Sequence, residues 1–142
     1  MSTKEPVFFD IYQESKDTDI EELSQGLLAH QANLSPKYFY DAMGSVLFHA
    51  ITLLPEYYPT RTEFEIFESQ AKDIHAQLPQ QATWLDLGAG SCQKAANLFA
   101  HTMPVTYVAE DISSAYLANH LKDLQAKHAQ VNMVGVGTDF SK

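Results

Sequence analysis

A glycine-rich turn stands where a predicted strand runs into a predicted helix, in the stretch WLDLGAGSCQK at Trp84–Lys94. Turns of this kind bring backbone N–H groups close to nucleotide-type ligands. A dinucleotide site uses G-x-G-x-x-G, with the second glycine near the pyrophosphate and the third for tight helix packing. Here Gly88 and Gly90 supply two glycines, but Gln93 stands at the third position. The turn therefore counts against a dinucleotide ligand.

S-adenosylmethionine (SAM) makes a different demand on such a turn, because it carries a carboxylate, a sulfonium and an adenosine but no phosphate. Gly88 and Gly90 would let the backbone pass close under this ligand. The N-terminus of the following helix and the Lys94 ammonium would both attract its carboxylate. Taken alone, the turn is equally compatible with a plain strand-to-helix connection.

Two further strand ends carry groups that suit the rest of SAM. The segment VTYVAEDIS ends with Glu110 and Asp111, and Asp111, about 23 residues beyond Gly88, is the one we expect to meet the ribose diol. The segment VGTDF places Asp139 and Phe140 after the next strand, where they could bind the adenine amino group and stack on its face. Three such signs, at the sheet edge where doubly wound folds bind ligands, predict a SAM site.

The elements that must position these residues alternate between strand and helix after Pro79, which predicts parallel strands joined by helical crossovers. The expected strands are 83–87, 105–109 and 131–136, and the expected helices are 93–100 and 114–128. The fold class is α/β, and residues 81–142 form the first βαβαβ half of a Rossmann-like domain, with about three parallel strands.

Residues 1–80 are expected to form an N-terminal helical segment. Its first 17 residues are polar and contain the aromatic patch Phe8, Phe9 and Tyr12. This composition is typical of an extended segment that packs against another part of the protein, or of a partly ordered tail. Capping boxes predict where two of its helices begin: Thr18 with Glu21 opens one to about Gln31, and Thr62 with Glu65 opens one to about Gln77. Between these two helices, Ser35 and Pro36 begin a helical pattern that runs to Leu54 and that Gly44 could divide. Pro55 and Pro59 then stand on either side of a stiff aromatic loop at residues 56–58.

Composition limits the classes of partner. The 142 residues are 45% hydrophobic, and 9 Lys and Arg against 18 Asp and Glu give a net charge of −9, which repels nucleic acids and anionic membranes. No stretch reads as a signal peptide or a membrane span, and the six histidines lack metal-ligand spacing, so we expect a cytoplasmic protein without a metal. The single cysteine, Cys92, excludes an internal disulfide. It is either a reactive thiol at a helix N-terminus or a small residue packed under the turn, and we favour the second.

The stretch PKYFYDAMGSVLFHAITLLPEYYPTRTEFEIF, residues 36–67, resembles the front segment of the histidine-specific methyltransferase family, and the resemblance continues through LDLGAGSCQK, VAEDISSAYL and GTDF. Members are SAM-dependent enzymes that make N-alpha-trimethylhistidine (hercynine) on the ergothioneine pathway. The resemblance implies cofactor-binding roles for Gly88, Lys94, Asp111, Asp139 and Phe140. It also implies an amino-acid pocket at Tyr57, with Tyr40 close by. Without it, these tyrosines and Tyr58 read as an aromatic cluster that braces the helical segment.

The resemblance covers only the front half of the family's length, so the later strands and the substrate domain are not represented. We therefore expect the SAM-binding half of an amino-acid N-methyltransferase, inactive alone, in which Tyr57 would orient the amine and no catalytic residue is certain. The alternatives are a non-catalytic SAM-binding or oligomeric regulatory module and, less well supported, a dinucleotide-binding domain. In the usual strand order the apolar edge of Trp84–Leu87 would be uncovered. This predicts that the chain dimerises or swaps strands through that edge, is completed by a separate polypeptide, or is a fragment of a longer product.

Overall fold

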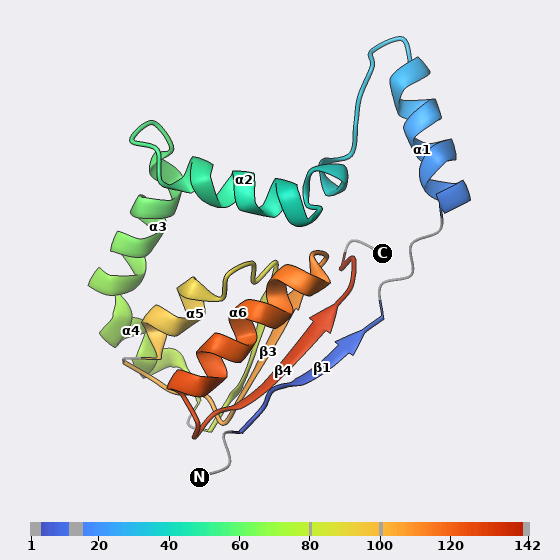
Figure 1. Ribbon diagram of the computed structural model, residues 1–142. Helices are drawn as coiled ribbons and strands as arrows, with labels where there is room; N and C mark the ends of the chain where they lie inside the picture. The colour runs from blue at the N-terminus through green and yellow to red at the C-terminus, as the bar shows by residue number, and fades with distance from the viewer. Residues whose placement is uncertain (1–3, 12–15, 80, 100, 141–142) are drawn as a thin grey trace.

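The fold is α/β, with one parallel four-stranded sheet in the order β1-β4-β3-β2 (Figure 1). The computed structural model describes residues 4–11, 16–79, 81–99 and 101–140. The strands are β1 (Val7–Asp10), β2 (Thr83–Leu87), β3 (Thr106–Asp111) and β4 (Asn132–Gly137). The three predicted strands are confirmed to within one or two residues at each end.

The expectation of three strands is corrected to four. The N-terminal lead-in contributes β1, which pairs in parallel with β4 so that Val7 lies beside Val134 and Asp10 beside Gly137. The Ile11 N–H continues the ladder by donating to the Gly137 carbonyl at 3.0 Å. Phe8 packs against the core from this strand, whereas Tyr12 of the predicted aromatic patch lies outside the described residues. The N-terminal segment is therefore not only helical.

Two helices of the α/β part, α5 (Gln93–Leu98) and α6 (Ser114–Lys127), lie on one face of the sheet (Figure 1). Both were predicted, and Ala100, the expected end of the first, lies outside the described residues. The core forms where α6 packs on β3 and β4, with Tyr107, Leu117 and Leu121 fully buried. Phe99, at the end of α5, packs on the sheet, since its ring centroid lies 5.6 Å from that of Trp84 and 5.4 Å from that of Tyr107.

The remaining helices arch over this α/β part. They are α1 (Lys16–Leu28), the short 3-10 helix η1 (Pro36–Phe39), α2 (Ala42–Thr52), α3 (Tyr58–Ser69) and α4 (Ala71–Gln77). Figure 1 shows α2 crossing the molecule above the ends of β3 and β4, with α3 and α4 descending beside α5. No helix in the described ranges is both long and apolar enough to cross a membrane.

Both predicted capping boxes are wrong, although the helices exist. The first helix begins at Lys16, so Thr18 lies inside it, and the helix assigned to Thr62 begins at Tyr58. Pro59 explains the second case, because its fixed φ suits the first turn of a helix and its missing N–H costs nothing there. That helix also ends at Ser69 and a second one begins at Ala71, where a single helix to Gln77 was predicted.

The break predicted near Gly44 lies earlier, at Asp41. The Asp41 carboxylate caps α2 by accepting the Gly44 N–H at 2.6 Å. A Cβ on Gly44 would stand 1.8 Å from the Phe39 carbonyl oxygen. Glycine is therefore required here by the close approach of η1 to the first turn of α2.

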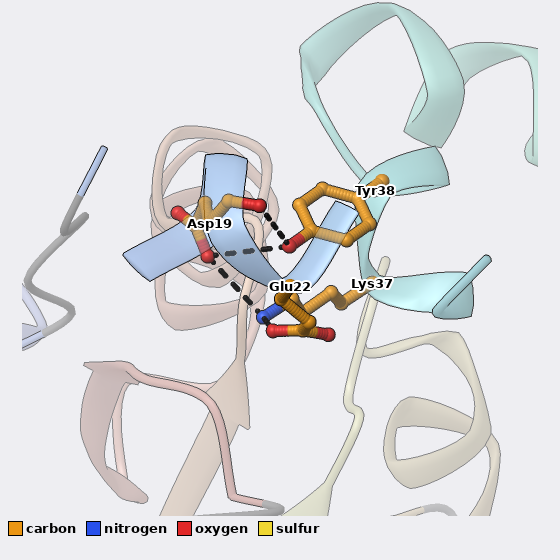
Figure 2. Close-up of polar contacts among 4 residues, drawn as sticks. All are labelled: Asp19, Glu22, Lys37 and Tyr38. Atoms are coloured by element: carbon orange, nitrogen blue, oxygen red, sulfur yellow. Dashed lines mark hydrogen bonds and ion pairs between the residues drawn. The ribbon is translucent and has the colours of Figure 1, made fainter. Parts of the chain in front are cut away.

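A polar cluster ties η1 to α1 (Figure 2). The Lys37 ammonium pairs with the carboxylates of Glu22 and Asp19, and the Tyr38 hydroxyl donates to the Asp19 backbone at 3.3 Å. The hydrogen bond to Glu22 raises the pKa of Lys37 above its ordinary value. This cluster holds the two front elements together, and it lies on a different part of the chain from the glycine turn.

Candidate functional site

The glycine turn has the backbone form that the sequence predicted. Gly88 and Gly90 have φ of 70° and 52°, in the left-handed region where side chains are strained. Apart from its two chain neighbours, no atom of the described residues lies within 4 Å of the place where a Cβ on Gly90 would stand, so the space above the turn is open there. Cys92, just before α5, also has a positive φ of 56°. The turn thus exposes backbone in the way a close-lying ligand requires.

Asp111, at the end of β3, holds this turn through its carboxylate. Oδ2 accepts the Gly90 N–H at 2.8 Å, and Oδ1 accepts the Ser113 N–H at 2.9 Å. Each carboxylate oxygen has a second lone pair, so both bonds leave acceptor capacity for a ligand hydroxyl. Glu110, the other member of the acidic pair, stands on the opposite sheet face, in register with Leu87 and Val136.

The third strand end also reaches the turn. Phe140 is half exposed, and its ring lies 3.8 Å from the position of a Cβ on Gly88. Its neighbour Asp139 is partly buried. The Thr138 N–H donates to the Asp111 carbonyl at 3.1 Å, which joins this loop to the end of β3. The residues predicted from three separate strand ends therefore meet at one place.

Lys94, expected to attract a carboxylate, has an anionic neighbour within the protein. Its ammonium lies 3.7 Å from the Glu63 carboxylate of α3, and both side chains are about half exposed. An exposed pair of this kind contributes little to stability. Sequence reasoning missed Glu63, since no motif places it opposite the first turn of α5.

The thiol of Cys92 is packed inside the protein. The residue is 1% exposed, and burial raises the pKa of its thiol to about 12. Beneath the turn, the Tyr107 hydroxyl donates to the Asp86 carboxylate at 2.8 Å. The alternative that we favoured for Cys92, a small residue under the turn, agrees with this packing.

The tyrosines predicted for a substrate pocket are joined by a residue that the sequence did not single out. The Phe48 ring on α2 lies between Tyr40 and Tyr57, with centroid separations of 6.0 and 5.9 Å and edge-on packing on both sides. Tyr57 is partly buried, whereas Tyr58 is 66% exposed and has no ring contact within the described chain. Tyr40 and Tyr57 therefore belong to an aromatic cluster around Phe48, as expected without the family resemblance, but Tyr58 does not join it. A substrate role for Tyr40 and Tyr57 stays a prediction.

Arg61 fixes the loop that presents Tyr57. Its guanidinium donates to three backbone carbonyls, those of Leu54, Pro55 and Tyr57, from one turn inside α3. These carbonyls lie between α2 and the first turn of α3, where the Leu54 carbonyl also accepts the Tyr57 N–H at 3.1 Å. The arginine of the PTRTE motif therefore acts as a cap between two helices.

A buried hydrogen bond joins α2, which carries Phe48, to the loop that follows β3. The Ser45 hydroxyl of α2 donates to the Ser113 hydroxyl at 3.0 Å, and both residues are buried. Ser113 is also the residue whose N–H binds the Asp111 carboxylate. Phe48 lies three residues beyond Ser45, on nearly the same face of α2. Ser113 thus links α2, which carries Phe48 of the predicted amino-acid pocket, to Asp111, which holds the glycine turn.

The chemistry of these groups fits SAM better than a metal or a dinucleotide. The turn offers open backbone, a carboxylate with spare acceptor capacity, a cation and an exposed ring, which are the kinds of group that a ligand with a ribose, a carboxylate and an adenine requires. Among the residues that the structure describes, no group of three or more His, Cys, Asp and Glu side chains could hold a metal ion.

The parallel sheet, the glycine turn at the end of its first Rossmann strand and the acidic residue at the end of the next define a Rossmann-like methyltransferase fold. Residues 19–142 match the model of a family described as histidine-specific methyltransferase, SAM-dependent, and the chain belongs to this family.

Named relatives agree with this assignment. The chain is 34% identical over 121 residues to a histidine N-alpha-methyltransferase of Mycobacterium tuberculosis, which covers 82% of the chain and 37% of the relative. It is 49% identical over 69 residues to the same-named enzyme of Mycolicibacterium smegmatis, covering 49% and 21%. A 4-dimethylallyltryptophan N-methyltransferase of Claviceps purpurea is 30% identical over 117 residues, covering 80% and 34%. The chain thus matches about a fifth to two fifths of each relative's length.

Proposed function

We propose that this chain is the SAM-binding part of an amino-acid N-methyltransferase. The observation that carries the proposal is the meeting of three strand ends at one open turn, with the Asp111 carboxylate bonded to the Gly90 N–H at 2.8 Å. Asp111 would receive the ribose hydroxyls, Lys94 the carboxylate of SAM, and Asp139 with Phe140 the adenine. Gly88 and Gly90 would bring backbone close beneath the ligand.

When bound, SAM supplies an electrophilic methyl group on a sulfonium. This chain's residues would then contribute alignment and a fitted electrostatic environment, for which no covalent nucleophile is needed. The Tyr57 hydroxyl, on the loop that Arg61 holds, would orient the lone pair of an unprotonated substrate amine. Packing of Phe48 against Tyr57 would keep that ring in place.

Histidine is the acceptor that we propose, because the family and two of the named relatives act on it. The Claviceps purpurea relative is named for a prenylated tryptophan, so the acceptor must be tested directly. We further propose that the chain transfers no methyl group alone, since it matches only part of the relatives' length. The function proposed for the isolated chain is therefore cofactor binding.

Calorimetric titration with SAM and with NAD tests the cofactor. SAM should bind, with an affinity at least tenfold weaker in Phe140→Ala, and NAD should not. Equal binding of both ligands, or of NAD alone, would show a dinucleotide site. Transfer of a radioactive methyl group from SAM to histidine or to tryptophan then tests activity. Transfer by the chain alone contradicts the proposal that the chain depends on further polypeptide. SAM binding without transfer, by the chain alone and with further polypeptide, supports the non-catalytic module.

A further inference from the structure

The N-terminal strand β1 ends at the same edge of the sheet as the glycine turn. All four strands run parallel, so Asp10, at the carboxyl end of β1, lies at the edge that also carries Gly88 and Asp111. The match with the family model begins only at residue 19. Membership of the family therefore assigns no role to β1.

Strand β4 has glycine at the two positions that residues of β1 overlie. Phe8 pairs in register with Gly135, and Asp10 pairs with Gly137. A Cβ on Gly135 would stand 2.3 Å from the Phe8 ring. A Cβ on Gly137 would stand 2.9 Å from Asp10 Oδ1. Both separations are too short for a side chain, so the two glycines of β4 fit the residues that β1 places beside them.

Asp10 also reaches the start of the helix that follows β3. Its Oδ1 accepts the hydroxyl of Ser114, the first residue of α6, at 3.0 Å. Gly137 makes room for this bond as well, since a Cβ there would stand 2.1 Å from Ser114 Oγ. One carboxylate thus joins the end of β1 to the start of α6 across β4.

The start of α6 lacks the usual side-chain cap. The first N–H groups of a helix have no partners within it, and an N-cap side chain commonly accepts one of them. Ser113 is the N-cap residue of α6, but its side chain caps no N–H, and its hydroxyl accepts that of Ser45 instead. The first turn of α6 is therefore held from outside, by Ser45 of α2 and by Asp10 of β1. A carboxylate at this end of a helix also suits the helix dipole.

Asp111 connects the start of α6 to the glycine turn. The Ser113 N–H donates to Asp111 Oδ1, and the Gly90 N–H donates to Oδ2 of the same carboxylate. Ser113 and Ser114 are adjacent in the chain, so a displacement of Ser114 would also move the N–H that orients Asp111. The position of the turn thus depends on what holds Ser114.

The other end of the N-terminal segment is anchored as well. The Lys4 ammonium donates to the Val131 carbonyl at 3.2 Å and to Asn132 Oδ1 at 2.6 Å, at the amino end of β4. At the carboxyl end of β4, the Ile11 N–H donates to the Gly137 carbonyl. Bonds at both ends of β4 therefore fix the strand that carries Asp10.

We propose that Asp10 is a positioning residue of the cofactor site: through the Ser114 hydroxyl it holds the start of α6, and with it the Asp111 carboxylate that supports the glycine turn. This inference rests on the proposed function, in which Asp111 receives the ribose hydroxyls of SAM. No contact between Asp10 and the ligand is required. A strand that lies outside the region matched to the family would thereby contribute to cofactor affinity.

Two substitutions of Asp10 test this role. Asp10→Ala removes the acceptor, whereas Asp10→Asn removes the charge but keeps an oxygen that can accept the Ser114 hydroxyl. In Asp10→Ala the Gly90 and Ser113 amides, followed by NMR, should exchange hydrogen about threefold faster, and SAM should bind about threefold more weakly in calorimetry, as the loss of an exposed hydrogen bond implies. Asp10→Asn should stay close to the parent chain in both measurements. Rescue by asparagine separates the hydrogen bond from the charge.

Two further substitutions are controls. Glu5→Ala removes a carboxylate from the other end of the segment, where it lies 3.9 Å from the Lys122 ammonium, and should change neither the two exchange rates nor the affinity. Ser114→Ala should act like Asp10→Ala, and combining the two should add nothing, because both remove the same bond. The β3 amides report opening of the sheet and should keep the parent rates in every variant.

The proposal is overturned if folded Asp10→Ala keeps the parent exchange rates at Gly90 and Ser113, or if the turn loosens without any loss of SAM affinity. It is also overturned if Asp10→Asn is as impaired as Asp10→Ala, or if Glu5→Ala has the same effect. Circular dichroism establishes that each variant is folded, and Ser114→Ala supplies the test if Asp10→Ala unfolds. If the parent chain binds no SAM, the proposed function fails, whereas the exchange rates still decide whether Asp10 holds the turn.

Discussion

Replacing Asp111 by asparagine should loosen the glycine turn and weaken cofactor binding together. The carboxylate accepts two backbone N–H groups, from Gly90 at 2.8 Å and from Ser113 at 2.9 Å. Asparagine keeps one acceptor oxygen and sets an NH₂ group against the other donor. One of the two N–H groups therefore loses its partner inside the protein, and the bond that remains is no longer charge-assisted.

The size of the effect follows from these two bonds. A hydrogen bond to a charged group contributes about 1.5–3 kcal/mol and a neutral one about 1 kcal/mol. Losing one of these bonds and weakening the other from charged to neutral gives roughly 2–5 kcal/mol. Because Asp111 is only partly buried, water can replace some of the loss, and we expect about 2 kcal/mol. The affinity for SAM should fall at least tenfold, since the ribose also loses a charged acceptor.

Urea unfolding and calorimetric titration with SAM measure the two effects on the same protein. Glu110→Gln is the matched control, because it removes the same charge from the adjacent residue, which faces away from the turn. Its free energy of unfolding should stay within about 0.5 kcal/mol of the parent chain. Equal stability of Asp111→Asn and Glu110→Gln would refute the inference that the carboxylate holds the turn.

Three further predictions concern the surroundings of the turn. Ser45→Ala removes the buried bond to Ser113 and should lower the free energy of unfolding by about 1–2 kcal/mol in urea titrations, whereas an unchanged midpoint would show that water replaces the bond. Burial raises the pKa of the Cys92 thiol from 9.0 to about 12. Below pH 9, alkylation of Cys92 should therefore be far slower in the folded chain than in the urea-unfolded chain. Because the pKa is higher in the folded chain, the free energy of unfolding should fall as pH rises from about 9 to 12. Glu63→Gln frees Lys94 and should strengthen SAM binding severalfold while changing stability by less than about 0.5 kcal/mol; weaker binding would mean that Glu63 positions the lysine.

Local sequence was sufficient for most of the secondary structure. Apolar runs bounded by Pro79, the glycine turn and polar loops marked the three strands of the α/β part, and periodic leucines marked α6. The capping boxes failed, since a threonine three residues before a glutamate also occurs inside a helix, and Pro59 started α3 earlier. A local pattern identifies an element more reliably than its first residue.

The candidate site could be predicted in outline because each of its parts follows a strand. Parallel strands bring their carboxyl ends to one edge, so Gly88, Asp111 and Phe140 could be grouped from the sequence. What could not be predicted was the contact that each side chain makes. Nothing in the sequence pairs Glu63 with Lys94 or places Phe48 between two tyrosines, since such contacts depend on how α2 and α3 pack.

The sequence by itself determined the fold class, the glycine turn and membership of the methyltransferase family, because these rest on residue order and local backbone preference. Only the tertiary structure decided that Val7–Asp10 joins the sheet and that Ser45 reaches Ser113. It also decided that α5 and α6 lie on the same face of the sheet (Figure 1). Those contacts join residues far apart along the chain, and their energy comes from burial and hydrogen bonds that no local pattern records.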